Sequence, residues 1–435
     1  MRSALITLSA LLLSATILVA GNGLQNTLLA VRGNLEGFSL LQIGLLLSVY
    51  YVGFILGCQL VPRWVKRVGH VRCFTALASI ASASALTHAL WVDAVAWLLL
   101  RGVTGFCLAG LTMIIESWIN ERATNQNRGR VLAVYRIVDF GALTVGQFLL
   151  TLADPQGFVL FALTSILISL CLVPVALSTA VVPQPIQAAK LDLRQLSHTA
   201  PLAAAASFAV GAANSAVWAV GPVYVQRLGH GLDTVAVFMS AMIVGGAVSQ
   251  WPLGLLSDRI DRRRMITVQA LVCGVTGALL AALTSSPPWL LMAGGAAFGC
   301  AAMPLFGLAA AHANDQAAPG EYVQVSGGLL LLYGVGAVIG PLLAPLFMAV
   351  LGPTALFAYT GLVHVGLAGF GAWRVRHGRP VIVEEQGAYV PVPRSTPVVF
   401  QLDPRSEPEQ APAAAGTPVA PSAGSDRRRV APTVD

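Results

Sequence analysis

The stretch QWPLGLLSDRIDRRR, residues 250–264, places four arginines and two aspartates in a chain that has few charges elsewhere. Long apolar runs flank this cluster, at about residues 234–256 and 265–284. A charged cluster between two runs that are each long enough to cross a bilayer is typical of a loop at a membrane surface. We therefore interpret residues 250–264 as a connection between two membrane-spanning helices.

The composition of the whole chain is that of an integral membrane protein. Of its 435 residues, 56% are hydrophobic and only 10% are charged, and the mean hydropathy is +0.74. A soluble domain contains about 25% charged residues. The net charge of +7 reflects the loops and does not indicate nucleic-acid binding. The six cysteines lie in or at the ends of apolar runs without paired spacing, so we expect no disulfide, metal site or cofactor.

Twelve apolar runs are long enough to span a membrane, since a helix needs about 20 residues to cross about 30 Å of hydrocarbon. The runs are residues 4–31, 40–61, 71–91, 94–119, 131–152, 158–181, 200–226, 234–256, 265–284, 289–313, 322–350 and 355–374. The sequence therefore predicts an all-α membrane protein with twelve transmembrane helices.

Basic residues are concentrated in alternate connections between these runs. They are Arg63, Lys66, Arg67, Arg72, Arg122, Arg128, Arg130, Lys190, Arg194, Arg259, Arg262, Arg263, Arg264, Arg374, Arg376 and Arg379. The other connections contain only Arg32 and Arg227. Because cytoplasmic loops carry the excess of Lys and Arg, this pattern predicts that both termini are cytoplasmic. We expect a protein of the bacterial inner membrane.

The longest internal polar stretch divides the twelve runs into six and six. It predicts an N-terminal half at residues 1–181, a central cytoplasmic loop at 182–199 and a C-terminal half at 200–375. Residues 376–435 contain ten prolines and show no apolar periodicity, which is typical of a disordered cytoplasmic tail.

The charged loop has a specific internal spacing. Gly254, Asp258, Arg259 and Arg263 follow the pattern G-x-x-x-D-R-x-x-x-R. This pattern resembles the cytoplasmic loop signature of the major facilitator superfamily. The segment RGVTGFCLAG, with Arg101 and Gly105, is similar to another element of that superfamily. The resemblance covers roughly residues 1–375 and points to a poorly characterised bacterial branch. It implies two six-helix halves of the major facilitator fold, and a transport function.

The corresponding loop of the first half is less complete. In PRWVKRVGHVR, residues 62–72, Arg67, Gly69 and Arg72 fit the pattern, but Pro62 replaces the glycine and Lys66 replaces the aspartate. The resemblance implies that such loops gate the cytoplasmic side. We therefore predict an asymmetric pair of gating loops, in which Asp258 has no acidic counterpart.

Four charged residues lie inside the predicted spans, at least three residues from either end, where a charge is costly and indicates function. Arg101 either binds an anion or couples a proton, or it forms structural hydrogen bonds. Glu116 and Arg136 should lie at similar depth, and a structural or gating ion pair is favoured over substrate contact. Asp139 is either a protonatable carrier or the partner of Arg136.

Uncharged polar residues form two further groups. Asn22, Gln25 and Asn26 share one face of the first span, and Asn214 and Trp218 share one face of the seventh. The resemblance implies that these spans line a substrate cavity. The alternative is hydrogen bonding between helices. We expect at least two of the five to face the cavity.

We predict a secondary active transporter of a small organic solute that works by rocker-switch alternating access, with proton coupling left open. The alternative is a transporter-fold sensor or assembly component that acts through a partner bound to the tail. The sequence contains no G-x-x-x-x-G-K-[ST], H-E-x-x-H or G-x-S-x-G motif, which argues against an enzyme. Besides the solute, the expected partners are H⁺ in the coupled case and the lipid bilayer, and we expect a monomer.

Overall fold

The structure is a computed structural model that describes residues 2–123, 127–177, 193–283, 287–318, 321–378, 383, 386–391 and 393–402. The side chains of residues 2–7 and 402 are not described. Within these ranges the chain forms helices and no strands, and twelve segments are long and apolar enough to cross a membrane. The predicted fold class is confirmed.

Six spans form the N-terminal half, and the sixth is built from two consecutive helices. They are α1 (Arg2–Leu35), α2 (Leu40–Val68), α3 (His70–Leu90), α4 (Ala94–Arg122), α5 (Arg128–Leu149, extended by η1, Leu150–Leu152), and α6 (Val159–Leu170) with α7 (Leu172–Ala176).

The C-terminal half repeats this arrangement after a short helix, α8 (Leu193–Thr199). Its spans are α9 (Pro201–Arg227), α10 (Leu232–Ser257), α11 (Arg262–Ala282), α12 (Pro288–Ala302) with α13 (Leu305–Asn314), α14 (Tyr322–Leu351) and α15 (Ala355–His377). Residues 182–192 of the predicted central loop, and Lys190 with them, lie outside the described residues.

Short polar signals fix where several helices begin. Ser39 and Gln42 form a capping box at the start of α2, in which each side chain bonds the backbone N–H of the other residue. Asp93 accepts a hydrogen bond from the N–H of Ala96 at the start of α4. Gly69 joins α2 to α3 with a φ of 88°, a conformation that favours glycine. The predicted gating residue Gly69 therefore forms the turn itself.

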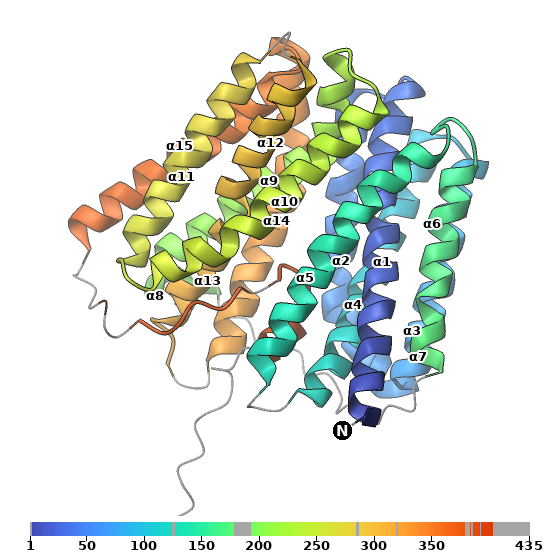
Figure 1. Cartoon of the computed structure of the whole chain (residues 1–435), viewed down its shortest axis with the longest axis horizontal. Helices are drawn as coiled ribbons and strands as arrows, with labels where there is room; N and C mark the ends of the chain where they lie inside the picture. The colour runs from blue at the N-terminus through green and yellow to red at the C-terminus, as the bar shows by residue number, and fades with distance from the viewer. Residues whose placement is uncertain are drawn as a thin grey trace, which may run out of the picture.

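The two halves lie side by side, and the chain starts at the lower end of the bundle in Figure 1. We call the end at which α1 begins and α15 ends the terminal face, and the opposite end the far face. The halves contact one another mainly through α2 with α14, α5 with α10, and α1 with α9. A solute passing between the halves would have to pass between these helices.

On the far-face side the helices of the two halves touch directly. Gly44 of α2 is so close to α14 that a Cβ atom would overlap the carbonyl oxygen of Pro341. One turn further along α2, Ser48 Oγ donates a hydrogen bond of 2.7 Å to the carbonyl oxygen of Val338. At the ends of α1 and α9, Asn34 Nδ2 donates to Gln226 Oε1 at 3.2 Å. Close backbone approach without side-chain filling is typical of small residues in membrane bundles.

On the terminal side a segment from beyond α15 lies between the halves. Residues 386–391 and 393–402, which we call the tail segment, run from the second half into the space next to α5, α4 and α14 and end in the helix η3 (Pro397–Leu402) (Figure 1). Val399 and Phe400 are buried there. The predicted disorder of residues 376–435 does not hold for the tail segment, because its apolar side chains pack against the bundle. Residues 403–435 lie outside the described residues.

Candidate functional site

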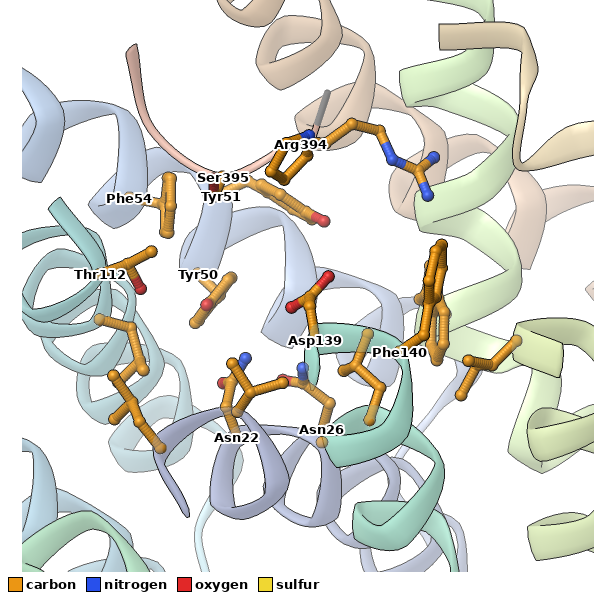
Figure 2. A pocket seen from close by; sticks show the side chains of 18 of the residues that line it. Asn22, Asn26, Tyr50, Tyr51, Phe54, Thr112, Asp139, Phe140, Arg394 and Ser395 are labelled. Atoms are coloured by element: carbon orange, nitrogen blue, oxygen red, sulfur yellow. The ribbon is translucent and has the colours of Figure 1, made fainter. Parts of the chain in front are cut away.

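A cavity of about 200 Å³ lies between the two halves. Both halves contribute aromatic rings to its wall: Tyr50, Tyr51, Phe54, Tyr135, Phe140, Trp218 and Tyr333. Polar groups enter it from one side, where Asn22 and Asn26 of α1 and Asp139 of α5 point toward the open space (Figure 2). Arg394 and Ser395 of the tail segment form the opposite wall. A mostly apolar cavity with a few convergent polar groups is typical of a small-molecule site.

Of the predicted cavity residues, Asn22, Asn26 and Trp218 line this cavity. Gln25, Asn214 and Arg101 do not line it, and each is at most 2% exposed. The three lining side chains are half-buried, as expected for groups at an internal space. Sharing a helix face was therefore too coarse a criterion, because Gln25 lies only one position from Asn26 and yet faces the packed interior.

Arg101 is buried behind the cavity wall. Its Nη2 donates to Asn26 Oδ1 at 2.6 Å, and its guanidinium lies 4.4 Å from the ring centre of Tyr50. Both partners line the cavity. A guanidinium stacked on a ring and bonded to an amide restrains both groups, so Arg101 orients two lining side chains from behind.

The charged residues within the spans form one of the two predicted ion pairs and not the other. Arg136 Nη1 and Asp139 Oδ2 form an ion pair at 2.9 Å, and Arg136 also lies 4.3 Å over the ring of Phe140. The pairing of Arg136 with Asp139 was one of the two predicted alternatives. The favoured pair of Glu116 with Arg136 is absent from the contacts of the described residues, because the three-residue spacing within α5 brings Asp139 to Arg136 first.

Glu116 is fully buried near the terminal-face end of α4 and accepts three hydrogen bonds. Tyr135 donates its hydroxyl to Oε1 at 3.1 Å. Ser395 and Thr396 of the tail segment donate their hydroxyls to Oε1 and Oε2, respectively. The hydrogen-bond partners that offset the cost of burying this carboxyl group are thus hydroxyl groups, two of them from outside the twelve spans.

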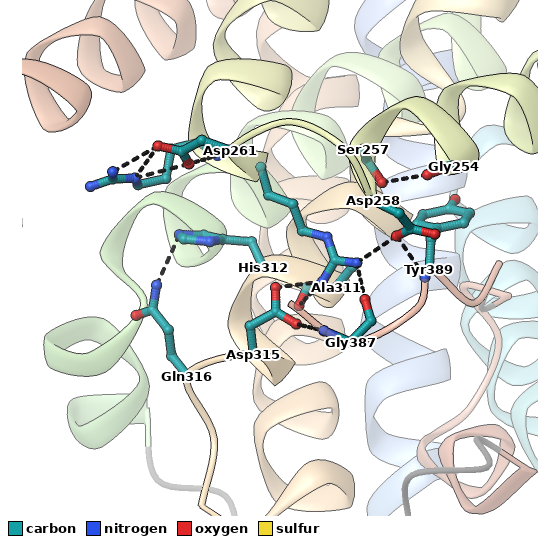
Figure 3. Close-up of polar contacts among 12 residues, drawn as sticks. Gly254, Ser257, Asp258, Asp261, Ala311, His312, Asp315, Gln316, Gly387 and Tyr389 are labelled. Atoms are coloured by element: carbon teal, nitrogen blue, oxygen red, sulfur yellow. Dashed lines mark hydrogen bonds and ion pairs between the residues drawn. The ribbon is translucent and has the colours of Figure 1, made fainter. Parts of the chain in front are cut away.

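The charged loop of the second half is organised around Arg262. This side chain is 1% exposed and donates to Asp258 Oδ1 at 2.8 Å, to Asp315 Oδ2, and to the backbone oxygens of Ala311 and Gly387 (Figure 3). Of the predicted loop residues, Asp258 thus takes part in the network. Arg262 and Asp315 were not predicted as site residues, because Asp315 is distant in sequence and the cluster of arginines does not show which one is buried.

The other predicted arginines of this loop act separately. Arg263 pairs with Asp261 at 2.7 Å, and Asp261 also caps α11 by accepting from the N–H of Arg263 at 2.9 Å. Burial alone would raise the pKa of Asp261, but the hydrogen bonds and charge of Arg263 outweigh it and lower that pKa. The cap is therefore intact at neutral pH and weakens only as the pH falls through this lowered value. Arg259 is exposed.

The corresponding loop of the first half has no comparable network. Lys66, Arg67 and Arg72 are exposed, and none of their side chains has a hydrogen bond or ion pair with another described residue. Pro62 lies inside α2. The two loops thus differ in their contacts in the described structure, and their unequal role in gating stays a prediction.

Tyr389 of the tail segment connects to the second-half loop. Its backbone N–H donates to Asp258 Oδ1 at 2.9 Å, and the N–H of Gly387 donates to Asp315 Oδ1 at 3.1 Å. A Cβ atom on Gly254 or on Gly307 would overlap the Tyr389 side chain. Burial raises the pKa of the Tyr389 phenol to about 12, so the ring is neutral at physiological pH. The predicted residue Gly254 thus provides the space in which the tail segment is held.

Among the described residues, no group of three or more His, Cys, Asp or Glu side chains is arranged to hold a metal ion. The six cysteines are all free.

Comparison with known proteins matches this architecture. The family model of the Major Facilitator Superfamily matches residues 11–278 and 232–404. Proteins named uncharacterized MFS-type transporter YcaD are similar to the chain. The one from Escherichia fergusonii is 26% identical over 80% of this chain and 89% of its own length. The one from Escherichia coli O139:H28 is 27% identical over 82% of this chain and 91% of its own length.

Solved structures share the fold at low sequence identity. The nucleoside transporter NupG is 13% identical, with a TM-score of 0.74 over 85% of this chain and 99% of its own. A bacterial homolog of the human lysosomal transporter Spinster is 15% identical, with a TM-score of 0.69 over 86% of this chain and 97% of its own.

Proposed function

The chain belongs to the Major Facilitator Superfamily, and on this premise we propose that it is a secondary transporter that moves a small organic solute by alternating access. The observation that supports this most directly is the cavity between the halves, with aromatic rings from both and Asn22, Asn26 and Asp139 directed into it. Rocking of the two halves about such a site would expose it to one face at a time.

The basic connections support the orientation that we propose. The terminal face carries the loops with Arg67 and Arg263, whereas the far-face loops contain only Arg32 and Arg227 as basic residues. By the positive-inside rule the terminal face is the cytoplasmic one. We propose that the protein lies in a bacterial inner membrane with both termini in the cytoplasm.

Asp139 is the residue that we propose for proton coupling. It lines the cavity and pairs with Arg136, so a proton on the carboxylate would weaken that pair and free the guanidinium. A protonation event in the cavity would thus change the electrostatics that a bound solute meets.

The test is transport by purified protein in liposomes. A panel of small organic solutes is offered with and without an imposed pH gradient, and internal solute is measured by mass spectrometry. We expect gradient-dependent accumulation of at least one solute, and we expect Asp139→Asn to abolish the gradient dependence. Asp154→Asn, an exposed carboxylate at the far face, is the matched control and should transport normally. If no solute moves under any gradient, the proposed function is wrong.

The alternative function, a sensor acting through a partner on the tail, gains no support from the tail segment. Gly387, Tyr389, Ser395 and Thr396 bond to this chain's own bundle, and Val399 and Phe400 are buried in it.

A further inference from the structure

The tail segment places a cationic side chain in the proposed solute cavity. Arg394 lines the cavity (Figure 2). Its guanidinium lies 5.6 Å from the ring centre of Tyr333. The Tyr51 ring meets that of Tyr333 edge to face, at 6.4 Å between centres. Aromatic faces attract cations through their quadrupole, and more strongly where water is excluded. This corner of the cavity is therefore suited to a positively charged group.

The charged residues at the cavity are also compatible with a cationic occupant. Arg136 and Asp139 line it, and Glu116 lies directly behind Ser395, which also lines it. Arg136 and Asp139 pair with one another, so their charges offset, and Arg394 is the remaining charged side chain among the lining residues. Arg101 is not part of the wall, because its guanidinium is held behind Tyr50 and Asn26. Without Arg394, the Asp139 carboxylate and the ring faces of Tyr51 and Tyr333 would favour a cationic occupant over an anionic one.

The tail segment is anchored on both sides of Arg394, whereas the guanidinium itself is weakly held. On one side Gly387 and Tyr389 bond to Asp315 and Asp258, and on the other Ser395 and Thr396 bond to Glu116. The Arg394 guanidinium donates only to the sulfur of Met303, and its buried Nη1 has no partner among the described residues. The hydrogen bonds on either side of Arg394 thus position its side chain, which makes few hydrogen bonds of its own.

We propose that the cavity binds a monovalent organic cation against Tyr51, Tyr333 and Asp139, and that Arg394 occupies this subsite until such a cation displaces it. The inference names the solute class for the proposed transport function and so rests on it. It also makes the tail segment a tethered competitor of the solute, because Pro393, Arg394 and Ser395 line the cavity where the solute would bind.

The experiment measures equilibrium binding to the detergent-solubilised full-length protein, with phenyltrimethylammonium as the probe. We expect Arg394→Ala to lower the dissociation constant at least tenfold relative to wild type. Arg394→Lys retains the charge and should bind nearly as weakly as wild type. Arg376→Ala removes an exposed arginine at the end of α15 and should leave the dissociation constant unchanged.

Two further measurements make the result specific. Benzenesulfonate, an anion of similar size, should bind Arg394→Ala no more tightly than wild type, and Asp139→Asn in the Arg394→Ala background should weaken cation binding at least fivefold. Gel filtration and thermal melting check that each variant is folded. Equal cation affinity of Arg394→Ala and wild type, or tighter binding of the anion, would overturn the proposal.

The binding assay and the liposome assay can reject the cation subsite and the transport function independently of one another. Tight cation binding by Arg394→Ala without flux of any solute would keep the cation subsite and reject the transport function. Flux of a neutral or anionic solute, with no effect of Arg394→Ala on cation binding, would keep the transport function and reject the subsite.

Discussion

The two halves meet in different ways at the two ends of the bundle. At the far face, α2 and α14 touch backbone to backbone where Gly44 faces Pro341, and Asn34 bonds Gln226 across the interface. At the terminal face the tail segment lies between the halves, and it bonds Glu116 of one half and Asp258 of the other. Direct contact excludes any other group, whereas an interface completed by a separate segment can be dismantled without unfolding either half.

This difference suggests where conformational control is located. The far-face contact depends on close packing of the two backbones, and such packing cannot be loosened in small steps without loss of contact. The terminal contact depends on hydrogen bonds to the side chains of Glu116 and Asp258, which a competing ligand or a rearranged tail can replace. In the proposed transport cycle, release of the tail segment would precede opening of the terminal side.

The largest effect is expected from Arg262, which joins the tail segment to the second half. Arg262→Met leaves Asp258 and Asp315 without their shared partner and Gly387 without a donor, and loss of one partner from a buried charge network costs about 3–5 kcal/mol. The melting temperature in detergent should fall by many degrees. Arg264→Met, an exposed arginine two positions away, should melt like wild type. Similar melting of both variants would contradict the central role of Arg262.

A smaller loss is expected at the direct contact. Gly44→Ala adds a methyl group that overlaps Pro341, and overpacking of this kind costs about 1–3 kcal/mol. The melting temperature should fall, and spin labels at the far-face ends of α2 and α14 should move apart. Gly366→Ala, at a position in α15 with open space around it, is the control and should not lower the melting temperature. An unchanged distance between the labels would show that Gly44 does not set the far-face contact.

The tail anchor at Glu116 can be measured with a native reporter. Cys58 is half-buried in an apolar cavity whose wall includes Ser395 and Val398. Glu116→Ala removes the acceptor of two hydrogen bonds from the tail segment, and an ordinary hydrogen bond contributes a net of about 0.5–1.5 kcal/mol. Maleimide labelling of Cys58 should therefore become about tenfold faster.

The controls for this experiment lie on the same helix and in the tail. Glu121→Ala removes an exposed carboxylate of α4 and should leave the labelling rate unchanged. Thr396→Val should accelerate labelling in wild type but have less effect in Glu116→Ala, because the two residues form one contact. Additive effects of the two substitutions would argue against that contact.

The smallest effect is expected from the two gating loops. Asp258→Asn removes a charge that faces Arg262, but the carboxylate is 30% exposed and its contribution is reduced by solvent, to about 1 kcal/mol or less. Cys58 labelling should rise two- to fivefold, since the tail segment loses part of its anchor. Lys66→Gln should have no effect, because Lys66 has no partner among the described residues. Equal effects of the two changes would remove the asymmetry.

Sequence reasoning predicted the fold better than the site. Asn22, Asn26 and Trp218 line the described cavity, because helix periodicity and the family resemblance together select a face, and their contact with a solute stays a prediction. Gln25 and Asn214 do not line it, because a helix face that borders a cavity also borders its neighbours. The partner of Glu116 could not be predicted, since Ser395 and Thr396 lie 279 and 280 residues away in a segment whose composition indicates disorder.

The amino-acid sequence by itself determined the twelve spans, the division into six and six, and the clustering of basic residues in alternate loops. These are local properties: about 20 residues compared with the thickness of a bilayer, and charges counted loop by loop. Only the tertiary structure decided that Arg262 is the buried arginine of its loop, that Arg101 supports the cavity wall, and that Arg394 enters the cavity. The positions of these three side chains depend on how helices that are far apart in the sequence pack together and where they leave space for a side chain. No local sequence pattern specifies that packing.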